Sequence, residues 1–249
     1  MEPFSLDGYR KLLESAAASG YSFDFFGEET MEKWSCLLRH DIDADLNAAL
    51  SISRTESDMG ARSTFFVMTR SSVYNLFSRV NHLLVDQILM GGHRLGLHYD
   101  EGFYPANKLG LQELVANEIQ FVERMFGTKI SAVSFHQPSA KILRNDLGIS
   151  GWVNTYDRKD MEGYVYLSDS NMHWKSQDPW NIFKSREHPK IQLLTHPIWW
   201  VGTGKEGTED LWKQALLNNF IRTIDFLHNT EGAFGNARKS LLNKIDHDN

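Results

Sequence analysis

The sequence predicts a parallel α/β fold: a (β/α) barrel of about seven strands in a single domain, with an open doubly wound sheet as the runner-up. Short apolar runs alternate with amphipathic segments of helical period along the chain, and such alternation builds right-handed βαβ units. The 249 residues contain no internal repeat and no Gly/Ser/Pro linker. We therefore expect one domain over residues 1–249, with a core of about 36–200 and flanking N- and C-terminal helices.

The expected elements follow from periodicity and from the glycines that end most of the amphipathic segments. A first strand is expected to begin with the apolar run 36–38 and to end at the carboxylates Asp41 and Asp43. Further strands are expected at 63–68, 94–98, 130–136, 152–156, 164–167 and 191–196. Helices are expected at 5–19, 45–59, around 83–89 with an end at Gly91, 110–126, 140–147 and 209–228. Residues 21–25 alternate in polarity, which predicts a short edge segment.

The composition argues against several classes of protein. The net charge of -6 and the scattered basic residues do not suggest a nucleic-acid partner. No apolar run reaches the ~18 residues that a transmembrane helix needs, and residues 1–7 lack the features of a signal peptide. The single cysteine, Cys36, rules out an intramolecular disulfide and favours a reducing compartment. We therefore expect a cytoplasmic protein without a membrane span.

Two carboxylates follow the first long apolar run. Asp41 and Asp43 are two residues apart, so on a regular strand both side chains point to the same face. Two carboxylates on one face repel each other unless a cation lies between them or one of them holds a proton. A helix cap is the simpler explanation of such residues, but Asp45 already suits that cap, which leaves Asp41 and Asp43 unexplained.

Titratable residues follow most of the other expected strands as well. In parallel α/β folds the carboxyl ends of the strands form the rim at which catalytic groups assemble. The residues at these ends are Asp41 and Asp43, His98 and Asp100, His136, Tyr156 and Asp157, Asp169, and His196. Each alone is a common loop or cap residue, but agreement at six strand ends predicts one shared site.

A metal ion is one use for such a rim. Catalytic zinc takes about three His or carboxylate ligands and keeps one position for water. Asp43, His98 and His136 are the set that we expect to hold it. Taken alone, His98 is better explained as a hydrogen-bonded rim histidine, and His136 as a strand-end residue before the Gln137-Pro138 turn; only the set of strand ends favours the metal site.

Five segments at these strand ends resemble, in order, the motifs of the polysaccharide deacetylase (NodB-homology, carbohydrate esterase family four) superfamily. Residues 39–43, Arg-His-Asp-Ile-Asp, stand where that family has paired aspartates, and residues 63–66 are similar to its second strand. The remaining segments are 92–98 at the second motif, 134–138 at the third, 166–170 with Trp174 at the fourth, and 193–196 at the fifth. The resemblance extends from Leu37 to about Trp200.

The resemblance implies a barrel of about seven strands, a divalent metal with Zn²⁺ as the first candidate, and hydrolytic removal of an acyl group from a sugar. Position by position, it implies that Asp41 is the general base, Asp43 and His98 are metal ligands, and His196 is the general acid. Asp169 then orients a catalytic partner and balances its charge, although a cap is an almost equal explanation.

The sequence departs from the family's pattern at three places. The paired aspartates are separated by Ile42, so the roles of Asp41 and Asp43 are open to exchange. The second motif's later histidine is replaced by Gly102, for which His136 is the expected substitute and Asp100 the alternative. The arginine of the third motif, which holds the fourth-motif aspartate, is absent because His136 stands near its place; Arg39 and Arg158 are the candidate partners of Asp169.

The expected substrate is an acetylated sugar or glycan precursor. The chain holds 7 Trp, 8 Tyr and 15 Phe, and aromatic rings serve both as core and as platforms for sugar rings. Tyr156 and Trp174 are expected to contact the sugar, and Trp199 and Trp200 to form an apolar wall at the acetyl methyl, with Leu194 more simply explained as core. The expected lack of export suggests a cytosolic precursor in surface-polysaccharide synthesis.

Two other classes of function remain open at this point. A barrel hydrolase of a small non-sugar amide or a phosphoester could use the same ligands. A catalytically silent carbohydrate-binding protein would bind glycan without metal and without releasing acetate. Measurements of metal content and of acetate release from acetylated sugars distinguish these two classes from a sugar deacetylase.

Overall fold

A computed structural model describes residues 2–28, 33–103, 110–144, 149–175, 177–234 and 237–238. The α-helices are α1 (Leu6–Ala18), α2 (Leu46–Asp58), α3 (Arg79–Met90), α4 (Leu111–Phe126), α5 (Ala140–Arg144), α6 (Pro179–Ser185) and α7 (Thr208–Thr230). The strands are β1 (Ser22–Asp24), β2 (Ser35–Ile42), β3 (Thr64–Val67), β4 (Arg94–Asp100), β5 (Ala132–His136), β6 (Val153–Asn154), β7 (Tyr164–Ser168) and β8 (Lys190–Thr195). Short 3-10 turns are η1 (Glu101–Phe103), η2 (Ser170–Met172), η3 (Pro197–Trp200) and η4 (Gly232–Phe234).

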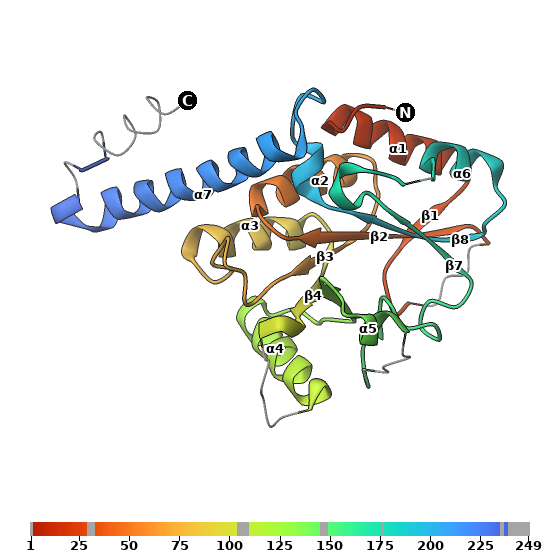
Figure 1. The fold of residues 1–249 in the computed structure, drawn as a ribbon, viewed down its shortest axis with the longest axis horizontal. Helices are drawn as coiled ribbons and strands as arrows, with labels where there is room; N and C mark the ends of the chain where they lie inside the picture. The colour runs from red at the N-terminus through yellow and green to blue at the C-terminus, as the bar shows by residue number, and fades with distance from the viewer. Residues whose placement is uncertain are drawn as a thin grey trace.

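All the strands pair in parallel and form one sheet that curls into a half-barrel (Figure 1). The order along the sheet is β6-β5-β4-β3-β2-β8-β7, and β1 pairs with the first residues of β2. The path ends at β6 and at β7, and no ladder joins those two ends among the residues that the structure describes. The prediction of a parallel barrel of about seven strands in an α/β domain is therefore confirmed, with a seam between β6 and β7.

The predicted elements match the observed ones to within a few residues, with three differences. Only Val153–Asn154 pair within the predicted strand 152–156, and the end of the helix predicted at 140–147 lies outside the described residues. The sequence prediction omitted α6, because seven residues are too few to show an apolar period. Its start was nevertheless readable, since Asp178 caps the helix and Pro179 occupies its first turn.

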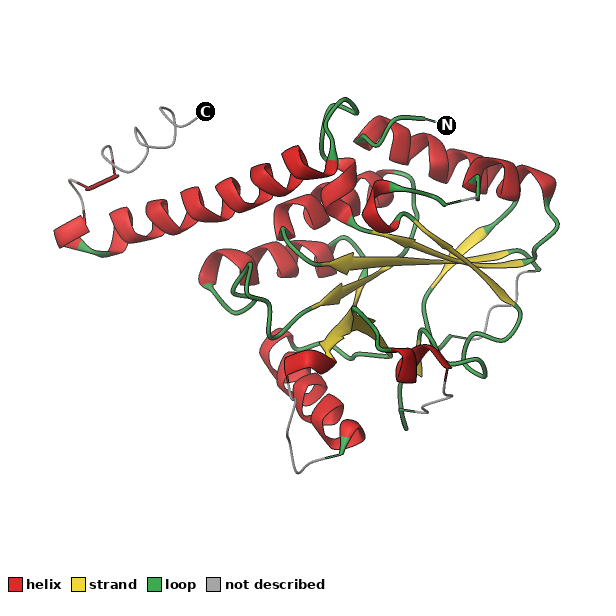
Figure 2. Ribbon diagram, viewed as in Figure 1, coloured by secondary structure: helices red, strands yellow, loops and turns green. Residues whose placement is uncertain are grey.

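The alternation of side chains along β2 positions the site. Every residue of this strand is buried, because β3 and β8 lie on both sides of it, helices pack on one face, and side chains of the curled sheet itself enclose the other. Arg39 and Asp41 project to the inner, concave face, whereas Leu38 and His40 project to the outer face beneath the helices. Helices α1, α2 and α3 cover that outer face (Figure 2). The concave face is therefore free to hold a site.

A small apolar cluster lies next to the polar residues on the concave face. It contains Phe26, Leu37, Phe66 and Ala132. The Phe66 ring lies directly against Gly96, where any Cβ would overlap it. Gly96 is the second glycine of the segment that resembles the family's second motif, so its role here is to admit this ring. Among the described helices, none is long and apolar enough to cross a membrane.

Candidate active site

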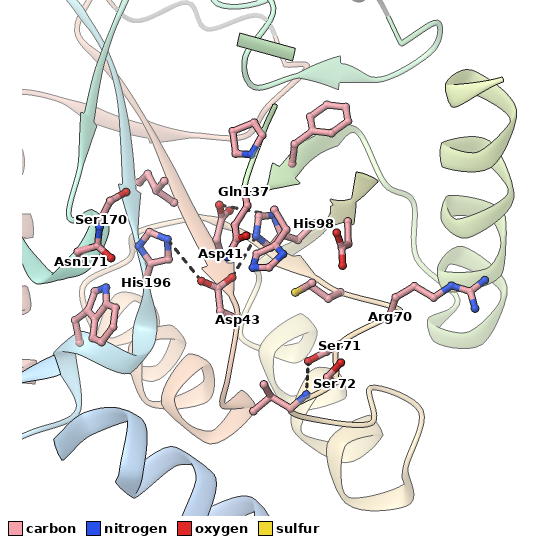
Figure 3. A pocket seen from close by; sticks show the side chains of 18 of the residues that line it. Asp41, Asp43, Arg70, Ser71, Ser72, His98, Gln137, Ser170, Asn171 and His196 are labelled. Carbon is pink, nitrogen blue, oxygen red and sulfur yellow. Dashed lines mark hydrogen bonds and ion pairs between the residues drawn. The ribbon is translucent and has the colours of Figure 1, made fainter. Parts of the chain in front are cut away.

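A cavity of about 530 Å³ lies at the carboxyl ends of the strands, inside the curl of the sheet (Figure 3). Its walls come from residues at or just beyond the ends of β2, β3, β4, β5, β6, β7 and β8. Seven of the ten residues expected at the site line it: Asp41, Asp43, His98, His136, Tyr156, His196 and Trp199. Most of the titratable residues that the sequence places at six strand ends therefore gather around one cavity, while Asp169 lies behind His196.

Asp41 is held by a buried arginine on its own strand. Arg39 Nε donates to Asp41 Oδ1 at 2.9 Å and Arg39 Nη2 to Oδ2 at 2.7 Å, and the arginine is fully buried. Burial by itself would raise the pKa of Asp41, but the guanidinium and the nearby His98 hold that pKa well below its usual range. Arg39 was one of two candidate partners for Asp169; it bonds Asp41 instead, because the two residues share one face of β2.

Asp43 lies one residue beyond β2 and faces His98. Asp43 Oδ1 is 3.2 Å from His98 Nε2, yet this buried oxygen has no hydrogen-bond partner among the described residues. Burial would raise the pKa of Asp43, and the proximity of His98 and His196 lowers it overall. Asp45 caps α2 by accepting from Asn47 N at 2.9 Å. Asp43 is therefore not a helix cap, and its Oδ1 is an oxygen that could bind a metal ion and accepts no hydrogen bond from the described residues.

Ser134 on β5 connects His98 to Asp41. Its Oγ lies 2.7 Å from His98 Nδ1 and donates to Asp41 Oδ1 at 3.3 Å. Register explains the contact, since Ser134 pairs directly with His98 across β4 and β5. All three side chains are almost completely buried. Asp41, His98 and Asp43 thus form one continuous polar group on the cavity floor.

His196, which follows β8, has a separate buried counterion. Its Nδ1 lies 2.6 Å from Asp169 Oδ1, and its backbone N–H donates to the same carboxylate. Trp200 Nε1 donates to Asp169 Oδ2 at 2.8 Å. Burial would lower the pKa of His196, but Asp169 outweighs it and raises this pKa to about 9. The structure thus places His196 as the side chain that Asp169 orients, and a catalytic role for this pair stays a prediction.

The expected metal ligands come only partly together. The rings of His98 and His136 are 5.5 Å apart between centroids and nearly perpendicular. Within the described part of the chain, no group of three or more His, Cys, Asp or Glu residues could by itself hold a metal ion. Asp43 and His98 still fit one, because a buried carboxylate oxygen without a partner lies beside an imidazole nitrogen. Asp100, the alternative ligand, also lines the cavity but accepts from Gly102 N.

Two of the expected substrate-binding aromatics lie elsewhere. Trp174 packs in the core against Phe4 and Trp180, and Trp200 is fully buried against Phe4 and Tyr9. Neither lines the cavity, because the chain turns through η2 and η3 and directs the Trp200 indole toward Tyr9 on α1 and the Trp174 indole toward Phe4 and Trp180 on α6. Trp200 serves the site through its N–H bond to Asp169. Leu194, expected to be core, does line the cavity.

The loop after β5 has an unusual backbone. Gln137 adopts φ 45°, in the left-handed region, although it is neither glycine nor asparagine and precedes Pro138. Both residues line the cavity beside His136. Strained backbone of this kind concentrates at functional sites, and here it shapes the cavity wall beside His136.

Sequence reasoning missed several residues of the cavity wall. Arg70, Ser71 and Ser72 after β3, Tyr166 on β7 and Trp212 on α7 all line it. Tyr166 lies on the concave face at the register position of Gln192, a place that strand alternation could have given. Trp212 reaches the cavity only because α7 packs over η3, and the sequence carries no signal for that contact.

The fold and the site together define a class: a parallel α/β half-barrel with a carboxylate and an imidazole, each with its own buried counterion, facing one cavity. No protein-family model matches the chain, and no curated protein sequence matches it.

Solved structures that the chain resembles include a family 4 carbohydrate esterase from Bacillus anthracis, which is 16% identical with a TM-score of 0.43 over 83% of this chain and 84% of that one. The deacetylase PplD of Streptococcus pyogenes, solved with acetate, is 12% identical with a TM-score of 0.43 over 86% and 88%. A CE4 family pseudoenzyme from B. anthracis is 13% identical with a TM-score of 0.41 over 76% of this chain and 63% of its own. The match thus spans less than two thirds of that pseudoenzyme.

Proposed function

We propose that this chain is a metal-dependent hydrolase that removes the acetyl group from an N-acetylated sugar. One observation carries the proposal: a carboxylate and an imidazole whose pKa values are pushed apart by separate counterions face one cavity. Asp41 is kept ionised by Arg39, and His196 is kept protonated by Asp169 up to a pKa of about 9. Such a pair supplies a base and an acid at the same pH.

The residues support a division of labour. A divalent cation, for which Zn²⁺ is the first candidate, would polarise the acetyl carbonyl and acidify a water molecule; Asp43 and His98 would hold it, with His136 as the third ligand. Asp41, fixed by Arg39 and Ser134, accepts the proton of the attacking water. His196 donates from Nε2, because its Nδ1 is engaged by Asp169. The leaving amine needs that proton, since it departs poorly without it.

The backbone near Gln137 is the proposed oxyanion donor. Its φ of 45° turns the loop at the cavity wall, and Pro138 has no N–H to offer. Trp199 and Leu194 line the cavity and are the apolar surfaces proposed for the acetyl methyl. Tyr156 and Tyr166 offer aromatic faces to a sugar ring.

The test combines acetate release with metal content. Substrates are N-acetylated mono- and disaccharides and a nucleotide-linked N-acetyl sugar, with zinc measured by elemental analysis. We expect Asp41→Asn to abolish turnover and keep zinc, and Asp43→Asn to lose zinc. Turnover retained in Asp41→Asn would refute its role as base. Zinc kept in Asp43→Asn and lost in Asp41→Asn would exchange the two roles.

His136→Ala tests the third ligand separately. Zinc lost in this variant supports a ligand set of Asp43, His98 and His136. Zinc retained moves the third position to Asp100 or water, and the chemistry proposed for Asp41 and His196 is unaffected.

A catalytically silent carbohydrate-binding protein is the second candidate. It is favoured by one observation, the lack of a ready-made three-residue metal site among the described residues. Such a protein would bind the acetylated sugar in calorimetry equally well with and without zinc, and would release no acetate.

A further inference from the structure

The proposed reaction uses Ser134 only to fix Asp41, yet this serine also contacts His98 and occupies a central position in the cavity floor. It is fully buried and contacts two side chains of the site, His98 and Asp41. A serine hydroxyl carries one proton and so can donate only one hydrogen bond. Which neighbour receives that bond decides the protonation pattern of the other.

The direction of the bonds is set by Asp41. This carboxylate is in a two-bond ion pair with Arg39, so it only accepts hydrogen bonds. If Ser134 donated to His98 Nδ1, its own lone pair would face the lone pair of Asp41 Oδ1 at 3.3 Å. The favourable arrangement is that His98 Nδ1–H donates to Ser134 Oγ, at 2.7 Å, and Ser134 Oγ–H donates to Asp41.

This arrangement determines the other nitrogen of His98. A neutral imidazole that carries its proton on Nδ1 has a lone pair on Nε2. That Nε2 lies 3.2 Å from Asp43 Oδ1, and this carboxylate oxygen receives no hydrogen bond from the residues that the structure describes. Two electron-rich atoms thus lie side by side, which is unfavourable until a cation joins them.

We propose that Ser134 is a positioning residue that holds His98 in the Nδ1–H tautomer, and so prepares Nε2 together with Asp43 Oδ1 to bind a divalent cation. Ligating histidines commonly donate their second ring N–H to an outer partner, and loss of that partner weakens metal binding. Ser134 also connects this ligand to Asp41, so the proposed base and the proposed metal ligand share one hydrogen-bonded chain. The cation in this inference is the one in the proposed function.

The first test is the tautomer itself, read by NMR. Protein with ¹⁵N-labelled histidine is prepared metal-free at pH 8, and His98 is identified by comparison with His98→Gln. We expect the proton on Nδ1 and an unprotonated Nε2. A proton on Nε2 in the unmodified protein would overturn the proposal, whatever the protein's activity.

The second test uses variants and zinc affinity. Ser134→Ala is expected to shift the His98 proton toward Nε2 and to weaken zinc binding about 10- to 100-fold in competition titrations. Ser134→Thr keeps the hydroxyl and is expected to restore both readouts. Unchanged tautomer and affinity in a folded Ser134→Ala would refute the positioning role; if that variant does not fold, the NMR result on the unmodified protein decides.

Failure of this inference and failure of the proposed function give different results. If the sugar panel releases no acetate but His98 carries its proton on Nδ1 and zinc binding depends on Ser134, the inference stands and the deacetylase proposal falls. If acetate is released while the proton is on Nε2, the reverse holds.

Discussion

Consecutive residues of β2 contribute to two buried polar clusters on opposite faces of the sheet. The inner cluster consists of Arg39, Asp41, Asp43, His98 and Ser134. The outer cluster consists of Tyr9, His40, Glu56, Ser63, His93 and Thr195. The outer cluster is enclosed, and the inner one is buried except at Asp43, whose side chain is 21% exposed; both place histidine beside carboxylate.

The clusters differ in how completely their polar atoms are bonded. In the outer cluster, Glu56 accepts from Tyr9 Oη at 2.5 Å and Ser63 Oγ at 2.6 Å and pairs with His40 Nε2 at 2.8 Å. His40 Nδ1 also lies 2.7 Å from Thr195 Oγ1. Together these bonds connect α1, α2, β2 and β8. In the inner cluster, Asp43 Oδ1 has no hydrogen-bond partner among the described residues.

The comparison separates two uses of buried polarity. A fully bonded cluster has no capacity for a ligand, and removing one member leaves its partners unsatisfied. A cluster with an unbonded oxygen beside an imidazole nitrogen is less favourable alone, and its missing interaction is available to a ligand. We therefore expect the outer cluster to govern stability and the inner cluster to govern binding.

The largest effect is expected from Glu56→Ala. The substitution leaves His40, Tyr9 and Ser63 without their shared acceptor in a buried site, so the free energy of unfolding should fall by about 3–5 kcal/mol. Urea denaturation measures it. The matched control is Asp43→Ala in metal-free protein, which removes the ion pairs to His98 at 3.2 Å and His196 at 3.9 Å. It leaves no shared acceptor missing in a fully bonded cluster and should cost less, about 1 kcal/mol. Equal losses in the two variants would erase the distinction between the clusters.

The second effect concerns the pH dependence of the metal-free protein. The folded pKa of His196, about 9, lies above the ordinary value of 6.5. Its stabilising contribution is therefore complete below pH 6.5, declines between 6.5 and 9, and is absent above 9. The shift corresponds to about 3 kcal/mol. The difference in unfolding free energy between wild type and His196→Gln should shrink by about that amount over this range; a constant difference would contradict the Asp169 ion pair.

Strand alternation explains how much of the site the sequence could predict. The rule that strand ends share one rim correctly brought Asp41, His98, His136 and His196 to one cavity. The same two-residue alternation could have added Arg39 and Ser134, which lie two positions before Asp41 and His136. Applying it would have given Arg39 to Asp41 rather than to Asp169.

Strand alternation could not predict the outer cluster or the part of the cavity wall that α7 contributes. Glu56 meets His40 only because α2 packs across β2, and Trp212 reaches the cavity only through the path of α7. In the sequence, nothing distinguishes Trp174 and Trp200 from Trp199, which lines the cavity. In the structure, the turns of η2 and η3 direct Trp174 and Trp200 into the core. Such contacts depend on how layers pack, and neither periodicity nor motif spacing encodes that packing.

The third effect is stabilisation by zinc. A ligand that binds only the folded state at 100 times its dissociation constant adds about 2.7 kcal/mol. We expect that gain for wild type in urea denaturation with and without zinc, and a near-complete loss of it in Asp43→Asn. Glu56→Gln should keep the gain although its baseline stability is lower. A gain that survives in Asp43→Asn would place the cation away from the inner cluster.

The smallest effect is expected from Tyr156→Phe, which tests where the inner cluster ends. Tyr156 Oη accepts from Arg39 Nη2 at 2.9 Å, while Arg39 keeps Asp41 and Gln192 as further acceptors. Loss of this one bond should lower the free energy of unfolding by about 0.5–1.5 kcal/mol. If the hydroxyl only supports Arg39, kcat for acetate release should fall less than tenfold and KM should not change. A large rise in KM would instead make Tyr156 a sugar contact, because its side chain also lines the cavity, and the inner cluster would then extend directly to the substrate.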